Sequence, residues 1–198
     1  MALIRKYLPF FASAGLLYLL LVLVYPFYQY YVDPDATAYL TIAKRYAGGD
    51  YVSAINGYWS PWGCWLTALL LKAGLLAIPA AIIINSFGAL GFLFISHSFF
   101  LKFNVESKWQ WLFCFTLALF LVYAVFWQSF DDLWECFFLL SCIRIMLSHR
   151  FTQNPSLWIV YGFMGTLAYF AKAYSFPFFI PKKVWRNTWG FLVLLKNF

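Results

Sequence analysis

Charged residues are scarce in this sequence. Asp, Glu, Lys and Arg together make up 11% of the 198 residues, and only seven residues are acidic. Soluble domains carry about 25% charged residues. A globule of this length cannot bury all the remaining apolar surface, because much of any folded surface must face water. The shortage of charge therefore excludes a soluble domain and indicates that lipid is the solvent.

Cysteine is sparse as well, and no two cysteines form a Cys-x-x-Cys pair. Cys64, Cys114, Cys136 and Cys142 lie in apolar runs, a position typical of small hydrophobic side chains rather than of a metal site or a disulfide framework. The 14 Lys and Arg residues give a net charge of +7, but they are scattered singly or in pairs. The sequence shows no basic face with interleaved aromatics, so it does not predict nucleic-acid binding.

Long apolar runs are abundant, and they predict the fold class. Hydrophobic residues reach 64% of the chain, with a mean hydropathy of +0.75. A helix needs about 20 apolar residues to cross a bilayer, and somewhat shorter runs suffice at the margin. The candidate spans are residues 8–25, 79–101, 109–127, 133–147 and 156–171. We expect an all-α polytopic transmembrane protein of about five spans, with interfacial helices in the first outer loop.

The apolar segment 61–76 decides the topology, because it is short and contains Lys72. If this segment lies in or dips into the outer interface, the inner side holds Arg5, Lys6, Lys102, Lys108, Arg144 and Arg150, and the outer side holds Lys44, Arg45, Lys72 and Lys172. The positive-inside rule favours this arrangement over a spanning segment, although the spanning alternative stays open. We expect a multi-pass protein of the cell inner or plasma membrane with a cytoplasmic amino terminus.

Carboxylates converge on the outer side in this topology. Six of the seven acidic residues lie there, namely Asp33, Asp35, Asp50, Asp131, Asp132 and Glu135. Acidic residues contribute little to orientation, so their convergence is independent information. The loop after the first span and the turn before the fourth span thus present carboxylates at the same depth, as a site at the outer membrane surface would.

The outer loop contains signals for a short amphipathic helix. Asp33 before Pro34 predicts an N-cap with proline at the first helical position, and Gly48-Gly49 predicts the helix end. Asp35 in the first turn suits the helix dipole. Capping alone would account for Asp33 and Asp35, and this explanation stays open beside a catalytic one.

The remaining outer charges also allow two explanations. Lys44 and Arg45 would face water or lipid headgroups from an interfacial helix. A plain turn before the fourth span would account for Asp131 and Asp132. Lys172 at the outer end of the fifth span either snorkels to the interface or holds a phosphate near the acidic residues.

These residues resemble the GT-C superfamily of membrane glycosyltransferases, which includes protein mannosyltransferases and aminoarabinose transferases. Asp35 with Tyr39 four residues later, in a helix ending Ala-Gly-Gly-Asp-Tyr, is similar to the family's first outer loop and its catalytic acidic residue. Tyr58-Trp59-Ser60-Pro61 resembles the segment that follows in that loop. Asp131-Asp132 lies where the family carries a second outer acidic residue, and the 169–172 stretch is similar to a family position, less specifically.

The resemblance implies transfer of a hexosyl or pentosyl group from a polyprenyl-phosphate donor to an acceptor at the outer membrane face. It implies a general base at Asp35 or Asp33. The implied substrate-binding residues are Asp131, Asp132, Lys172, Lys44, Arg45 and Tyr39, with the cations stabilising the departing polyprenyl phosphate. A divalent cation is the expected cofactor if the reaction uses one. The expected partners are the lipid-linked donor and membrane lipids, without nucleic acid, and the oligomeric state stays open.

The chain departs from the family in its details and its length. Ala36 follows Asp35 where the family often has Glu, and Ser60 precedes Pro61 where it often has Lys or His. Family members have many more helices, so we expect residues 1–180 to form an amino-terminal transmembrane module with outer loop 26–78, followed by a basic and apolar tail, 181–198, of a truncated product or fragment. The alternatives are a non-catalytic transporter or assembly subunit, and an inactive remnant of the transferase.

Overall fold

The computed structural model describes residues 2–127, 131–173 and 175. These residues form α-helices and no strands, as the sequence predicts. The helices are α1 (Ala2–Tyr28), α2 (Pro34–Gly48), α3 (Tyr51–Ala54), α4 (Pro61–Lys72), α5 (Ala77–Lys102), α6 (Ser107–Trp127), α7 (Asp132–Met146) and α8 (Pro155–Ala171). The expected tail, 181–198, lies outside the described residues.

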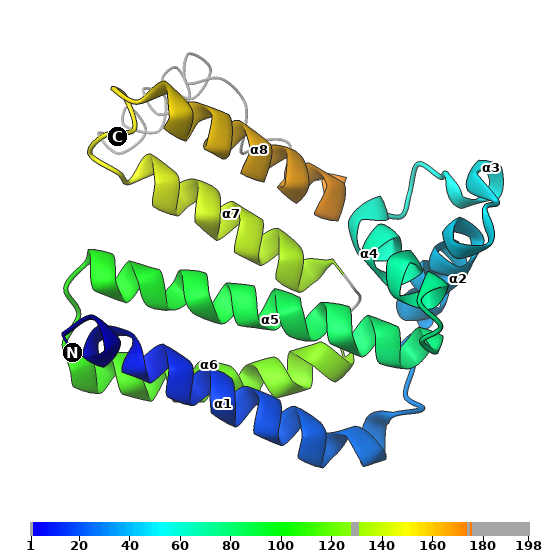
Figure 1. Cartoon of the computed structure of the whole chain (residues 1–198), viewed down its shortest axis with the longest axis horizontal. Coiled ribbons are helices and arrows are strands. Elements are labelled where there is room, and N and C mark those ends of the chain that lie inside the picture. Colours follow the sequence, from blue (N-terminus) through cyan, green and yellow to red (C-terminus); the bar gives the residue numbers. More distant parts are fainter. Residues whose placement is uncertain (1, 128–130, 174, 176–198) are drawn as a thin grey trace, which may run out of the picture.

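Of the helices in the described residues, α1, α5, α6, α7 and α8 run side by side, and the shorter α2, α3 and α4 gather at one end of them (Figure 1). The long helices α1, α5, α6, α7 and α8 reverse direction at each connection, with α1 packed on α6, α5 on both α6 and α7, and α7 on α8. The short helices α2, α3 and α4 lie where α1 ends and α5 begins. The amino terminus and the α5–α6 and α7–α8 connections lie at the opposite end.

Three of these helices are long and apolar enough to cross a membrane. They are Lys6–Tyr28, Ala77–Lys102 and Ser107–Phe126. Helices α7 and α8 have 15 and 17 residues, fewer than the roughly 20 that a full crossing requires. The helix boundaries agree with the expected apolar runs to within a few residues. The length and apolarity of these helices therefore indicate a helical membrane protein, with three candidate spans in the described part of the chain.

The core of the α1, α5 and α6 bundle is mostly apolar, with a few buried polar side chains such as Ser13, Asn85 and His97. Leu17, Leu93 and Leu121 are fully buried there, and they pack with small residues such as Ala118 and Cys114. Small side chains let helix backbones approach closely, which is how helices associate in lipid. This part of the fold follows from hydropathy alone.

Helix α7 begins beside the middle of α5 and not beside its start. A Cβ atom added to Gly88 would lie 3.2 Å from the Trp134 ring, and one added to Gly91 would lie 3.1 Å from the Phe137 ring. Gly88 is about three turns into α5, which corresponds to about 16 Å from the first residue of that helix. Helix α5 therefore extends past the first turn of α7, and α7 and α8 are short because they occupy only part of that length.

Helix α4 fills the space at this end of the bundle. It packs against α2, α5 and α8, and it lies at the end of the long helices and not among them (Figure 1). That position is the one expected for segment 61–76 if it stays on one side of the bilayer. The chain turns from α4 into α5 through Gly74, whose φ of 92° lies in the left-handed region that favours glycine.

Candidate functional site

Helix α2 begins and ends at the predicted residues. The Oδ1 atom of Asp33 accepts a hydrogen bond of 2.9 Å from the Asp35 amide, and Pro34 occupies the first helical position. Gly49 ends the helix with a φ of 83°. The capping interpretation of Asp33 is therefore confirmed as its local role, while its predicted catalytic role stays a prediction.

The two ends of the Asp35–Tyr39 pair differ in their surroundings. Asp35 is exposed in the first turn of α2, whereas Tyr39, one turn later, is only 2% exposed. The Tyr39 ring packs edge-on against Trp59 at 5.0 Å between ring centroids. Burial raises the pKa of Tyr39, and the nearby negative charge of Asp131 raises it further. Tyr39 of α2 thus lies close enough to Asp131 for the two groups to influence each other's charge.

Asp131 is the most enclosed of the predicted site residues. Its side chain is fully buried in the turn before α7, and Oδ1 accepts a 2.7 Å hydrogen bond from the Gly63 amide of α4. Oδ2 is also buried and makes no hydrogen bond with any residue in the described ranges. Burial raises the pKa of this carboxyl well above its usual range, although the Gly63 amide and the Lys172 charge act in the opposite direction.

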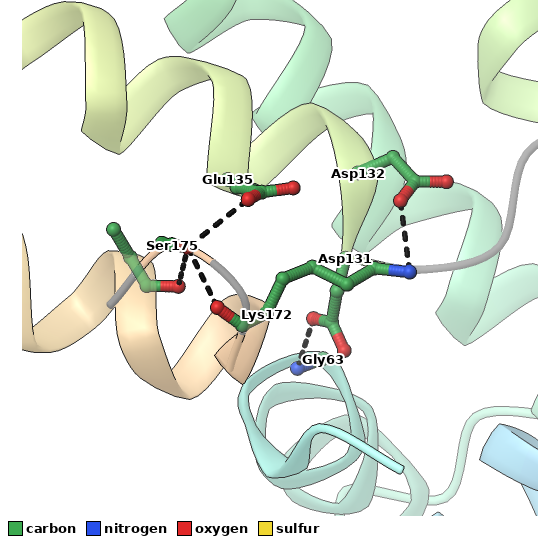
Figure 2. Close-up of polar contacts among 7 residues, drawn as sticks. Gly63, Asp131, Asp132, Glu135, Lys172 and Ser175 are labelled. Carbon is green, nitrogen blue, oxygen red and sulfur yellow. Dashed lines mark hydrogen bonds and ion pairs between the residues drawn. The ribbon is translucent and has the colours of Figure 1, made fainter. Parts of the chain in front are cut away.

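Asp132 and Lys172 form an ion pair beside it. Lys172 Nζ lies 2.9 Å from Asp132 Oδ1, with side chains 18% and 31% exposed respectively. Asp132 is the first residue of α7, and Lys172 follows the last residue of α8. Figure 2 shows Lys172 reaching across from the end of α8 to the start of α7. The structure therefore brings together three residues that the sequence predicts for one site, from segments about 40 residues apart.

Glu135 and Ser175 complete this group. The Ser175 hydroxyl is buried and lies 3.0 Å from Glu135 Oε1, 2.6 Å from the Lys172 carbonyl oxygen and 3.0 Å from the Ala168 carbonyl oxygen (Figure 2). A hydroxyl carries one proton, so it donates to one of these oxygens at a time. We call Asp131, Asp132, Glu135, Lys172 and Ser175 the carboxylate–lysine cluster.

Gly63 contacts this cluster and Ser175 belongs to it, and the sequence does not predict either of them as a site residue. Gly63 donates a hydrogen bond to Asp131 through its backbone amide, and no pattern of side chains in the sequence predicts a contact of this kind. Ser175 lies three residues after Lys172, and this spacing lets its hydroxyl reach the Lys172 carbonyl. That proximity to a predicted site residue is the one signal that could have identified it.

Lys44 and Arg45 lie elsewhere. Both are exposed near the last turn of α2, and Arg45 Nη1 donates to the Ser53 carbonyl oxygen at 2.7 Å. Asp50 caps α3 beside them, where hydrogen bonds from Ser53 lower its pKa. In the part of the chain that the structure describes, neither cation makes an ion pair or hydrogen bond with the carboxylate–lysine cluster. Their expected part in substrate binding stays a prediction.

The cluster contains an ammonium group among its carboxylates. Within the described ranges, no group of three or more His, Cys, Asp or Glu side chains is arranged to hold a metal ion. The Lys172 ammonium is bound by Asp132 and its charge also reaches Asp131. A partly exposed ammonium of this kind can bind an anion such as a phosphate by exchanging or sharing its carboxylate partner.

An apolar groove opens along the side of the bundle, beside the middle of α5. It has a volume of about 390 Å³ between α1, α5 and α7. Its lining consists of Phe10, Phe87, Leu90, Gly91, Phe94, Trp134 and Phe137. Trp134 lies in the first turn of α7, two residues after Asp132, so one end of the groove approaches the carboxylate–lysine cluster along the same helix.

Comparison of this chain with known proteins finds no significant match. No family model matches it, and no curated protein and no solved structure has a significant match. The resemblance to the GT-C superfamily therefore depends on the residues quoted above and on nothing further.

Proposed function

We propose that this chain is a membrane glycosyltransferase that moves a sugar from a polyprenyl-phosphate donor to an acceptor hydroxyl at the outer membrane face. The observation that carries the proposal is the meeting of α2, α4, α7 and α8 at one end of the bundle, which groups Tyr39 and the carboxylate–lysine cluster. A buried polar cluster in a membrane protein is costly to fold, so such groups mark functional sites by default.

The proposal includes a topology of about five spans. Helices α7 and α8 would be the short fourth and fifth spans, with α4 at the outer interface making up the missing length. The bundle end that holds the amino terminus would be cytoplasmic, since Lys6, Lys102 and Arg144 belong to that end. The inner or plasma membrane remains the proposed location.

Asp35 is the proposed general base. It is exposed and one turn from Tyr39, and it is free of the capping role that occupies Asp33. Asp35 would take the proton of the acceptor hydroxyl, and the acceptor oxygen would form a new bond to the anomeric carbon. The bond from that carbon to the phosphate oxygen would break, and its electron pair would leave with the polyprenyl phosphate.

Lys172 is the proposed partner of that leaving group. Negative charge grows on the phosphate as the bond breaks, and a fixed cation stabilises this charge in the transition state. Asp132 would hold the ammonium in place before the donor binds. The lipid chain of the donor would lie between helices, and the apolar groove that starts near Trp134 has suitable chemistry for it.

A second candidate function is a structural one. The Asp132–Lys172 ion pair joins α7 to α8, and Ser175 satisfies Glu135 within the same cluster. Such pairing alone would hold two short helices together in a non-catalytic assembly subunit. This reading predicts that substitution of Asp35 changes nothing measurable, because Asp35 is exposed and takes no part in the pairing.

The test is turnover by the purified chain in detergent. Release of polyprenyl phosphate is measured from a panel of lipid-phosphate sugars, with Asp35→Asn and Asp33→Asn compared with the natural sequence. Asparagine is as good an N-cap as aspartate, so Asp33→Asn keeps the start of α2 and serves as the matched control. We expect transfer to be abolished in Asp35→Asn and retained in Asp33→Asn.

The possible outcomes separate the two candidate functions. Full activity of Asp35→Asn would reject Asp35 as the base, and loss confined to Asp33→Asn would assign that role to Asp33. No turnover by well-folded protein with any donor would favour the structural role of the cluster.

A further inference from the structure

Helix α4 lies across the neighbouring ends of α7 and α8. The Trp62 ring packs edge-on against Trp134 at 5.7 Å and against Phe138 at 5.4 Å, both from α7. Trp65 contacts Phe170 of α8 at 5.4 Å. One helix thus touches both elements that supply the Asp132–Lys172 pair.

The start of α4 is capped from a distance. The first amides of a helix have no partner within the helix and need an acceptor. Ser60 occupies the N-cap position but makes no side-chain capping hydrogen bond. Asp131, 68 residues after Gly63 in the chain, accepts a hydrogen bond from the Gly63 amide instead.

The Asp131 carboxyl is fully buried, and only one of its two oxygens accepts a hydrogen bond from a described residue. Asp131 is 0% exposed, and its buried Oδ2 atom makes no hydrogen bond with any described residue. Burying a carboxyl carries a large penalty, so its retention calls for a role beyond filling space. The contact with Gly63 is one that neither α4 nor α7 can make alone.

We propose that Asp131 is a positioning residue that latches α4 over the Asp132–Lys172 pair, and that α4 must leave this latch to admit substrate headgroups from the outer face. The admission of substrate rests on the proposed transferase function. The latch itself does not, because it is a contact between α4 and the turn before α7. Opening would bend the connections on either side of α4. The connection after α4 contains Gly74, whose backbone can adopt conformations that other residues rarely reach.

A native cysteine reports on the state of α4. Cys64 follows Gly63, is 0% exposed, and its Sγ lies 3.5 Å from the Tyr39 carbonyl oxygen and 3.7 Å from that of Ser60. Lifting α4 would separate Cys64 from Tyr39 and expose its thiol. Cys114 is equally buried, in the α1, α5 and α6 bundle, so the chain carries its own control for general unfolding.

The experiment is maleimide labelling of the whole chain in detergent, with each cysteine quantified by peptide mass spectrometry over time. Asp131→Ala and Asp131→Leu remove the acceptor, and leucine keeps most of the side-chain volume in case alanine prevents folding. We expect both to label Cys64 about tenfold faster, the factor that corresponds to the loss of one buried hydrogen bond. Cys114 should remain protected. Asp131→Asn retains an oxygen acceptor and should restore slow labelling.

Three results would overturn the latch. In the first, Cys64 stays as protected in Asp131→Leu as in the natural sequence while Cys114 is also protected. In the second, Cys114 becomes labelled together with Cys64 in Asp131→Leu, which would make Asp131 a general support of the fold. In the third, Asp131→Asn labels as fast as Asp131→Ala. None of these readouts involves transfer, so the latch and the proposed function can fail independently.

Discussion

The bundle of α1, α5 and α6 and the end formed by α2, α4, α7 and α8 are built on different principles. The bundle buries apolar and small side chains, with Leu17 and Leu121 fully enclosed. The other end also packs apolar side chains, such as Trp62 on Trp134. It adds contacts between polar groups, namely the Asp132–Lys172 pair and the Gly63–Asp131 hydrogen bond. Apolar packing in lipid tolerates many sequences, whereas each buried polar group needs its specific partner.

Replacing Lys172 should have the largest effect on activity, because it removes a charged group from the polar end and leaves the bundle unchanged. Lys172→Ala leaves Asp132 without its ammonium beside two further carboxylates. We expect polyprenyl-phosphate release to fall by about 10²–10³-fold, the usual loss when one group that stabilises transition-state charge is removed. Turnover with the donor of the main assay measures this.

Lys72→Ala is the matched control for that substitution. Lys72 is an exposed lysine at the end of α4, on the same side of the molecule. The substitution Lys72→Ala removes one positive charge from the proposed outer face and leaves the carboxylate–lysine cluster unchanged. Equal losses in the two variants would mean that general surface charge, and not the position of Lys172, governs the reaction.

The sequence predicts the bundle well because apolar run length has a direct physical meaning in lipid. It predicts the helices of the outer loop too, because Asp33, Pro34 and Gly49 are local signals. The meeting of Asp131 with Gly63 is different. It depends on where α4 crosses α7, and neither residue carries a local pattern that encodes this contact.

The expected roles of the outer cations show the same limit. Sequence placed Lys44, Arg45 and Lys172 on one side of the membrane, which says nothing about their separation within that side. Arg45 binds the Ser53 carbonyl and Lys172 binds Asp132. Depth follows from hydropathy, but lateral position follows from tertiary packing.

The two regions meet where α7 packs on α5. Substitution of Gly88 at this contact tests how much the close packing contributes to stability. An added Cβ at Gly88 would lie 3.2 Å from the Trp134 ring and 3.3 Å from the Leu133 Cβ, which cannot move without its backbone. We expect Gly88→Ala to lower the free energy of unfolding by about 1–3 kcal/mol through overpacking. Thermal unfolding in detergent measures the change.

Gly162 provides the comparison for Gly88. It is also a helix-interior glycine, but nothing lies within 4 Å of an added Cβ. Gly162→Ala should leave stability unchanged or raise it by up to about 1 kcal/mol, the gain in helix propensity. If both alanines act alike, close approach of α7 to α5 is not what Gly88 provides.

The smallest expected effect is a dependence of stability on pH through Asp131. Burial raises the pKa of this carboxyl, so the folded chain binds the proton more tightly than the unfolded chain does. The stability that neutral Asp131 contributes is then fully present below the ordinary carboxyl pKa, near 4, and it is lost as pH rises through the raised pKa. The Gly63 amide and Lys172 favour the ionised form, and the neighbouring Asp132 and Glu135 oppose it, while Tyr39 and Cys64 face it from α2 and α4. The amide and Lys172 partly offset the effect of burial on the pKa of Asp131, so the expected change in stability is small.

The measurement uses Asp131→Asn, which cannot ionise. The difference in melting temperature between this variant and the natural sequence should therefore grow as pH rises from 4 to 8. A constant difference over that range would show that Asp131 keeps one protonation state throughout, and that burial of this carboxyl does not make the polar end of the molecule sensitive to proton binding.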